Sequence, residues 1–165
     1  MVPEDDTLKS LSLITRREVE ARVIAPLIEA FSQEFGKEQT LKILDKTIKQ
    51  IAKEQGTQLA KNKGGNTISI FAETINNWEK DDALQIENVE QTDTRLCFNV
   101  IKCRYAELYQ KLGIPGLGVL LSCNRDVASI EGFNPHIKLY RTQTIMEGGD
   151  LCDFCYRMEE NLSIK

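Results

Sequence analysis

The spacing of the apolar residues changes near Asp82 in this 165-residue chain, and this change limits the folds that the chain can adopt. Before that point, apolar side chains recur every three or four residues, which is typical of amphipathic helices. The pattern predicts a first helix that ends at Gly36, a second that ends at Gly64-Gly65, and a third over about 67–78. Pro26 lies inside the first helix, where its missing N–H predicts a kink or a new start.

After residue 82 the apolar period is two, which indicates β-strands. Alternation at 84–87 and again at 96–100, with a turn between them, predicts a β-hairpin. Two further alternating runs, at 137–145 and 151–158, are joined by a glycine-containing stretch at 146–150. Glycine tolerates the positive φ that tight turns require, so these two runs predict a second hairpin.

The two hairpins are separated by residues with helical spacing, at 106–112 and again after Pro115. We therefore predict an α+β fold, in which N-terminal helices are followed by a small four-stranded antiparallel sheet with helices on one face. The length fits a single domain over residues 1–165, with a helical part at about 8–80 and a sheet-containing part at about 83–158. The uncovered sheet face predicts a cleft or a homodimer interface.

The charge balance excludes several kinds of partner. The chain has 21 basic and 25 acidic residues, so it has no surplus of positive charge for nucleic acid or anionic lipid. The N-terminal segment is acidic, unlike a signal peptide, and no apolar run approaches the ~18 residues of a membrane span. We expect a cytoplasmic protein whose partner is a small molecule, with no nucleic acid and no membrane.

All five cysteines lie after residue 96. Disulfides do not persist in a reducing cytosol, which leaves free thiols or metal ligands as the expectation. Cys152 and Cys155 form a C-x-x-C, but on an alternating strand they point to opposite faces, so we interpret the motif as coincidental. Cys103, Cys123 and Cys152 each lie at the boundary of an element and predict a site for a divalent metal. The alternative is that each packs as a small apolar side chain.

A few charged residues have the placement that acid–base or binding chemistry requires. Arg104 and Arg141 lie beside or within the segments in which apolar and polar residues alternate, and a guanidinium at such a place can bind a carboxylate. Asp126 follows closely after Cys123 and is a candidate general base, and Glu147 is a second. The alternatives are that the arginines lie on the solvated face, that residues 124–126 end a helix, and that Glu147 is a turn residue. No serine-hydrolase, nucleotide-binding or zincin motif occurs.

Several segments together form an ordered set that covers roughly residues 11 to 158. They are Arg16-Arg17-Glu18-Val19-Glu20-Ala21-Arg22 with Ala25-Pro26-Leu27, Phe98-Asn99-Val100 leading to Cys103-Arg104-Tyr105-Ala106-Glu107, Leu121-Ser122-Cys123-Asn124-Arg125-Asp126, Glu131-Gly132-Phe133-Asn134-Pro135, Arg141-Thr142-Gln143-Thr144-Ile145-Met146-Glu147-Gly148 and Cys152-Asp153-Phe154-Cys155-Tyr156. In this order they resemble the bacterial L-2-amino-thiazoline-4-carboxylic acid hydrolase family. Cys155 departs from the family pattern, which has a basic or polar residue there.

The resemblance implies a hydrolase that opens the ring of 2-amino-thiazoline-4-carboxylate to give N-carbamoyl-L-cysteine. Water must add to ring carbon 2 and sulfur must leave, and a zinc-like or manganese ion held by the three thiolates would activate the water. Asp126 or Glu147 would take its proton. The substrate-binding residues expected within the matched segments are Arg104, Tyr105, Asn124, Asn134 and Arg141.

The sequence is also consistent with two other hypotheses for the function. In the first, one cysteine thiolate attacks carbon 2 directly, and a neighbouring arginine lowers its pKa. In the second, the protein is a small-molecule-binding or sensory domain without turnover, because helices followed by a sheet with late cysteines also resemble the layout of four-vinyl-reductase-type domains.

Overall fold

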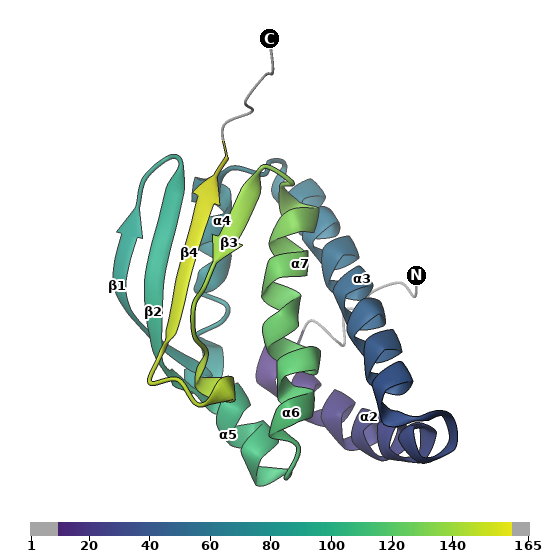
Figure 1. The fold of residues 1–165 in the computed structure, drawn as a ribbon. Coiled ribbons are helices and arrows are strands. Elements are labelled where there is room, and N and C mark those ends of the chain that lie inside the picture. The colour runs from purple at the N-terminus through teal and green to yellow at the C-terminus, as the bar shows by residue number, and fades with distance from the viewer. Residues whose placement is uncertain (1–9, 160–165) are drawn as a thin grey trace.

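The computed structural model describes residues 10–159 (Figure 1). The elements are α2 (Leu13–Phe35), α3 (Lys37–Lys63), α4 (Ile68–Ile75), η1 (Lys80–Asp82), β1 (Leu84–Gln91), β2 (Arg95–Cys103), α5 (Arg104–Lys111), α6 (Pro115–Gly118), the π-helix η2 (Val119–Cys123), α7 (Asn124–Phe133), β3 (Ile137–Tyr140), η3 (Ile145–Glu147) and β4 (Cys152–Met158). Helices thus precede a hairpin, and further helices separate that hairpin from the last two strands. The predicted α+β class is confirmed.

The N-terminal helices end where glycine was expected to end them. Gly36 has a φ of 90° and follows α2, and Gly64 lies in the left-handed region after α3. The predicted new start at Pro26 is wrong, since α2 continues through it. Ala21 and Ile28, on either side of Pro26, pack into the same core, which favours one unbroken helix. Over residues 10–159, none of the helices combines the length and apolarity that crossing a membrane requires.

The four strands form one antiparallel sheet in the order β1-β2-β4-β3. One face of the sheet is buried, and α4 lies behind the strands in the view of Figure 1. Alternate residues of the two central strands fill that face, namely Leu96, Phe98 and Val100 of β2 with Cys152, Phe154 and Tyr156 of β4. The intervening residues are partly or fully exposed. A four-stranded sheet with helices on one face is therefore confirmed.

The second predicted hairpin is shorter than its apolar alternation indicates. Strand β3 ends at Tyr140, and η3 lies in the connection to β4, so the predicted strand at 137–145 is wrong beyond residue 140. The carboxylate of Asp153 accepts hydrogen bonds from the backbone N–H groups of Thr142 and Gln143, both at 2.9 Å. These donors are consequently not free to extend a strand ladder.

Helix α7 was not predicted from the sequence. The interpretation of residues 124–126 as the end of a helix is wrong, because η2 runs directly into α7, which begins at Asn124. The first turn of α7 is polar, so the helical spacing of the apolar residues after it was not recognised. The buried residues of α7 are Arg125, Ala128, Ile130 and Phe133.

Helices α3 and α7 lie side by side in Figure 1 and approach each other to backbone contact. A Cβ atom on Gly132 would lie 1.9 Å from the carbonyl oxygen of Lys53, and one on Gly56 would lie 1.9 Å from that of Ser129. The hydroxyl of Thr57 also donates a hydrogen bond to the carbonyl of Gly132 at 3.0 Å. Only glycine leaves room for this approach at both positions.

One disulfide overturns the expectation that all five cysteines are free. Cys97 and Cys155 are direct partners in the register of β2 and β4, with Cα atoms 4.0 Å apart, and their sulfur atoms are bonded. Both lie on the exposed face of the sheet, opposite to the buried Cys152, so the prediction that Cys152 and Cys155 point to opposite faces is confirmed. The remaining free thiols are Cys103, Cys123 and Cys152.

The contact between α3 and α7 predicts a large effect of a small substitution. Gly132→Ala places a methyl group where the carbonyl of Lys53 lies, so we expect the free energy of unfolding to fall by roughly 1–3 kcal/mol or more. Urea unfolding followed by far-UV circular dichroism measures the change. Gly116→Ala is the matched control, because a Cβ there has open space and alanine favours a helix. Equal stability of the two variants would contradict the prediction.

Candidate functional site

A cavity of about 170 Å³ lies between the two hydrophobic cores of the protein. One core joins the buried sheet face to α4 and α7, and the other joins α2 and α3 to α5 and η2. For scale, a cavity of ~150 Å³ in a protein core accommodates benzene. The size therefore suits a single small ring. The residues that line the cavity are Leu13, Arg17, Ala52, Gln55, Phe71, Trp78, Leu84, Val100, Cys103, Tyr105, Ser122, Cys123, Arg125, Asp126, Ser129, Arg141, Met146, Cys152 and Phe154.

Aromatic side chains form the wall on the sheet side of the cavity. The ring centroids of Phe71 and Trp78 are 6.1 Å apart in an edge-on arrangement, and those of Trp78 and Phe154 are also 6.1 Å apart. The guanidinium of Arg141 lies over the Phe154 ring, 4.9 Å from its centroid. This wall offers flat apolar surfaces to a ligand ring, and Arg141 brings a cation to the same place.

Arg141 is held by an ion pair at the edge of this wall. Its Nη1 lies 2.6 Å from Oδ2 of Asp126, and its Nη2 donates a hydrogen bond to the carbonyl of Cys123 at 3.1 Å. About 24% of the Asp126 side chain is accessible, and this residue also lines the cavity. Burial raises the pKa of Asp126, and Arg141 opposes that shift. A carboxylate with a raised pKa beside a cavity is suited both to accept and to return a proton.

Two further guanidinium groups on the cavity share a single carboxylate. Arg17 Nη1 lies 2.7 Å from Oε2 of Glu20, and Arg125 Nη2 lies 3.4 Å from the same oxygen. Arg125 also donates to the carbonyl of Leu121 at 2.7 Å and to Oε1 of Gln55 at 3.4 Å. Burial lowers the pKa of Arg125 to about 10, and Arg17 acts in the same direction. Two cations with one carboxylate leave a net positive charge, which favours an anionic ligand.

The three free thiols all line this cavity. Cys103 ends β2 and accepts a hydrogen bond from the N–H of Ala106, Cys123 ends η2, and Cys152 begins β4 and accepts one from the N–H of Ile145. Burial raises the pKa of Cys103 to about 11, and it also raises the pKa values of Cys123 and Cys152. The thiols are consequently protonated near neutral pH, and a protonated thiol is a poor nucleophile.

The expected metal is not matched by the arrangement of these side chains. Within residues 10–159, no three or more histidine, cysteine, aspartate or glutamate side chains are grouped as a metal ion requires. Cys103, Cys123 and Cys152 thus do not form such a group, and the divalent ion stays a prediction from the sequence.

The structure gathers some of the predicted site residues and leaves others outside. Besides the three cysteines, the cavity contains Tyr105, Asp126 and Arg141. Four predicted residues lie outside the cavity and have other hydrogen-bond partners.

Two of these four residues are exposed. Arg104 donates a hydrogen bond to the carbonyl of Asp81, and Glu147 accepts one from the hydroxyl of Thr144. The other two are amides: Asn124 donates a hydrogen bond to the carboxylate of Asp45, and Asn134 donates one to the carbonyl of Asn66.

Sequence reasoning missed the two arginines that share Glu20. Arg17 lies on the apolar face of α2, in helical register with Leu13 and Ala21. A cation at that spacing, inside an apolar stripe, is the signal that could have identified it. Arg125 had no comparable signal, because α7 was not recognised as a helix.

Two solved structures share this fold with TM-scores of 0.51. One is a trafficking protein particle complex subunit 3 from Naegleria fowleri covalently bound to palmitic acid; it is 13% identical, and the match covers 88% of this chain and 96% of that one. The other is the phenol-responsive sensory domain of the transcription activator PoxR with phenol; it is 8% identical, and the match covers 82% of this chain and 73% of that one. No curated protein matches the sequence.

The family comparison covers most of the chain. The family described as L-2-amino-thiazoline-4-carboxylic acid hydrolase matches residues 16–156. This range includes α7, strands β1 to β3, most of β4 and nearly all the residues that line the cavity. The chain therefore belongs to the L-2-amino-thiazoline-4-carboxylic acid hydrolase family.

Proposed function

We propose that this protein is a hydrolase that binds a small carboxylated thiazoline in its cavity and opens the ring with water. The observation that carries the proposal is the combination, in one ring-sized cavity, of a net positive charge at Arg17 and Arg125 with the carboxyl group of Asp126. Family membership supplies the substrate class, L-2-amino-thiazoline-4-carboxylate.

In this proposal each part of the cavity has one task. Arg17 and Arg125 bind the substrate carboxylate, because guanidinium groups form strong, directional hydrogen bonds to carboxylates. Trp78 and Phe154 pack against the flat ring. Arg141 forms an ion pair with Asp126, so it holds the Asp126 carboxyl group in place and opposes the rise in pKa that burial causes.

Asp126 then moves the protons that ring opening requires. As the carboxylate, it takes a proton from water while the oxygen bonds to ring carbon 2, and it delivers that proton to the ring nitrogen. It next takes the proton of the new hydroxyl as the C=O forms, and it delivers this second proton to sulfur as the carbon–sulfur bond breaks. Water thus supplies one oxygen and two protons, and the product is N-carbamoyl-L-cysteine with a free thiol.

The neutral state of the three free thiols favours water over a cysteine nucleophile. Attack by Cys103, for instance, would first require removal of a proton from a thiol whose pKa burial raises to about 11. Asp126 needs no such activation, because the same side chain accepts a proton as a carboxylate and returns it as an acid.

A second candidate function is ligand binding without turnover. It is favoured by the fold shared with the PoxR sensory domain, whose structure holds phenol, a ligand whose size matches this cavity. In this case a ring would bind between the aromatic wall and the arginines, and no product would form.

Asp126→Asn tests the proposed proton transfer. We expect the wild-type protein to release free thiol from L-2-amino-thiazoline-4-carboxylate, and the variant to lose roughly 100-fold or more in kcat. The exposed Glu107→Gln is the matched control and should keep full activity. Ligand-induced thermal stabilisation distinguishes the two candidate functions, because stabilisation without thiol release in the wild type would support the binding domain and contradict the hydrolase.

Arg17→Gln tests the binding of the substrate carboxylate. We expect KM to rise roughly tenfold or more, because a charge-assisted hydrogen bond is lost, with a smaller change in kcat. Arg22→Gln is the control on the same helix, since its side chain is 58% exposed and that of Arg17 is 13% exposed. With 2-amino-thiazoline, which lacks the carboxylate, the two variants should have the same KM. If Arg17→Gln also raises the KM for 2-amino-thiazoline while Arg22→Gln does not, the assigned role is contradicted.

Metal removal tests the remaining prediction from the sequence. We expect thiol release to continue after chelation, because the mechanism above uses water and Asp126 alone. The metal content of the wild type and of Cys123→Ser is measured in the same preparations. If the variant loses bound metal and activity together, the three-cysteine metal site is supported and the metal-free mechanism is contradicted.

A further inference from the structure

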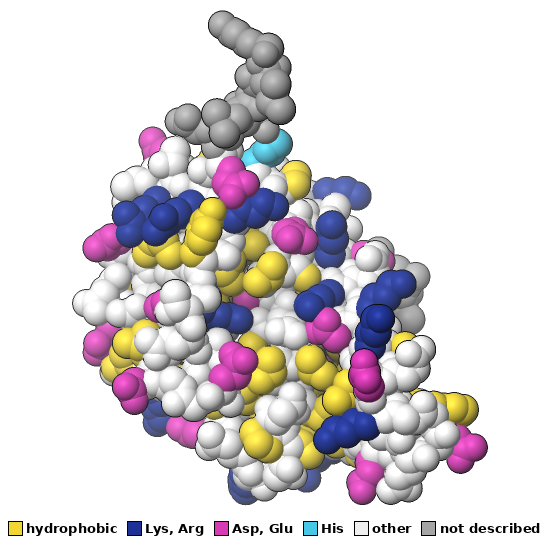
Figure 2. Space-filling view, in the orientation of Figure 1, with side chains coloured by type: hydrophobic (Ala, Val, Ile, Leu, Met, Phe, Trp, Pro, Cys, Tyr) yellow, Lys and Arg dark blue, Asp and Glu magenta, His cyan; other side chains and the backbone are white. Residues whose placement is uncertain are grey.

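The exposed face of the sheet carries basic side chains that face one another across the strands. In the register, Arg157 of β4 lies opposite Arg95 of β2 on one side and opposite Lys138 of β3 on the other. The next row along the strands contains the disulfide, with Cys155 opposite Cys97 and Tyr140 opposite Cys155. Figure 2 shows basic side chains gathered over this upper part of the sheet.

Facing side chains of like charge destabilise a sheet unless an anion lies nearby. Acidic groups balance this face only in part. Glu90 lies 3.7 Å from Arg95, and Glu159 accepts a hydrogen bond from the hydroxyl of Tyr140. Within the described chain, neither Arg157 nor Lys138 forms an ion pair. The row therefore has the charge that attracts an anion from solution.

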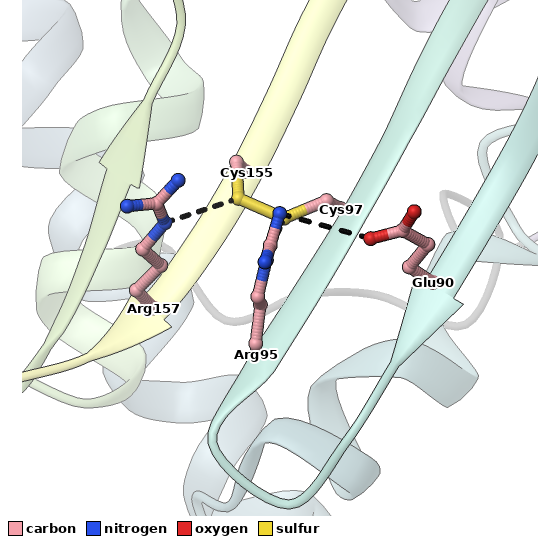
Figure 3. Close-up of a disulfide and its surroundings, with 5 residues drawn as sticks. All are labelled: Glu90, Arg95, Cys97, Cys155 and Arg157. Carbon is pink, nitrogen blue, oxygen red and sulfur yellow. Dashed lines mark hydrogen bonds and ion pairs between the residues drawn. A yellow bond between two sulfur atoms is a disulfide. The ribbon is translucent and has the colours of Figure 1, made fainter.

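The two arginines of this row also contact the disulfide itself (Figure 3). Arg95 Nε lies 2.9 Å from the sulfur of Cys97, and Arg157 Nε lies 3.3 Å from that of Cys155. Each sulfur thus has a guanidinium beside it on the solvent side of the sheet. A cation at this place stabilises a thiolate, and a stabilised thiolate is a better leaving group in thiol–disulfide exchange.

We propose that Cys97 and Cys155, with Arg95, Arg157 and Lys138, form a thiol–disulfide exchange site for a low-molecular-weight thiol that carries carboxylates. The cations bring the anionic thiol to the strands, and its thiolate attacks one sulfur. A mixed disulfide forms, the Cys97–Cys155 bond breaks, and the released cysteine leaves as a thiolate beside its arginine. A second thiolate then attacks the mixed disulfide, so that two small thiols are oxidised to one disulfide while Cys97 and Cys155 are reduced.

This site is separate from the cavity. Side chains alternate along a strand, so Cys97 and Cys155 face outward while their neighbours Phe98 and Phe154 face the core. The proposal consequently does not rest on the hydrolase proposal, and each can fail without the other.

The test compares three small thiols that differ in charge. The full chain, purified in air, is incubated with glutathione, 2-mercaptoethanol or cysteamine, which are respectively anionic, neutral and cationic. Alkylation and mass spectrometry follow the opening of the Cys97–Cys155 bond. For each thiol, the rate constant for opening of the Cys97–Cys155 bond is measured in the wild type and in the double variant Arg95→Gln/Arg157→Gln. The ratio of the two rate constants is then compared between thiols, because the intrinsic reactivity of each thiol cancels in it.

We expect this ratio to be largest for glutathione, at roughly three- to tenfold, smaller for 2-mercaptoethanol and smallest for cysteamine. The glutathione ratio should also decrease as salt screens the arginines. Lys42→Gln/Lys46→Gln, on the exposed side of α3, is the matched control and should give ratios near one for all three thiols. In Cys155→Ser, glutathione disulfide should form a stable mixed disulfide with Cys97.

Three results would overturn the proposal. The first is alkylation of Cys97 and Cys155 in the air-purified protein, which would mean that no disulfide forms there. The second is the same ratio for all three thiols, which would mean that the cations do not select an anionic partner. The third is failure of Cys97 to accept glutathione in Cys155→Ser while circular dichroism shows a folded chain.

Discussion

The backbone contact between α3 and α7 is the constraint on which the rest of the site depends. Gly56 and Gly132 let the two helices approach until each glycine faces a carbonyl of the other helix. At this separation Arg125 of α7 reaches Gln55 of α3 and Glu20 of α2. A larger residue at either glycine would push α7 away from α3 and would displace Arg125 and Asp126, which α7 carries into the cavity.

The cavity combines two kinds of surface. Its sheet side is aromatic, and its helix side carries two cations with one carboxylate between them. The Arg141–Asp126 pair lies where the two surfaces meet. A small ring with an attached carboxylate matches both surfaces at once, because the ring loses contact with water against the aromatic side chains while the carboxylate gains hydrogen bonds.

The two central strands separate two kinds of cysteine chemistry. On the inner face, Cys152 is buried and its pKa is raised, so its thiol is inert near neutral pH. On the outer face, Cys97 and Cys155 are bonded to each other beside arginines in contact with solvent. Cys152 and Cys155 are only three residues apart on β4, yet they have opposite reactivity because the pleat of the strand places them in opposite environments.

The sequence by itself determined many, though not all, of the local features of this protein. Apolar spacing identified the N-terminal helices, their glycine ends and the β1–β2 hairpin, and the ordered segments identified the family. Asp126 and Arg141 were chosen as candidates from their neighbours in the sequence, and both line the cavity. Only the tertiary structure decided that Arg17 and Arg125 share Glu20, and that Cys97 pairs with Cys155. The physical reason is that periodicity reports which face of one element is buried, whereas these contacts join elements far apart in the chain and depend on how closely the helices and strands pack.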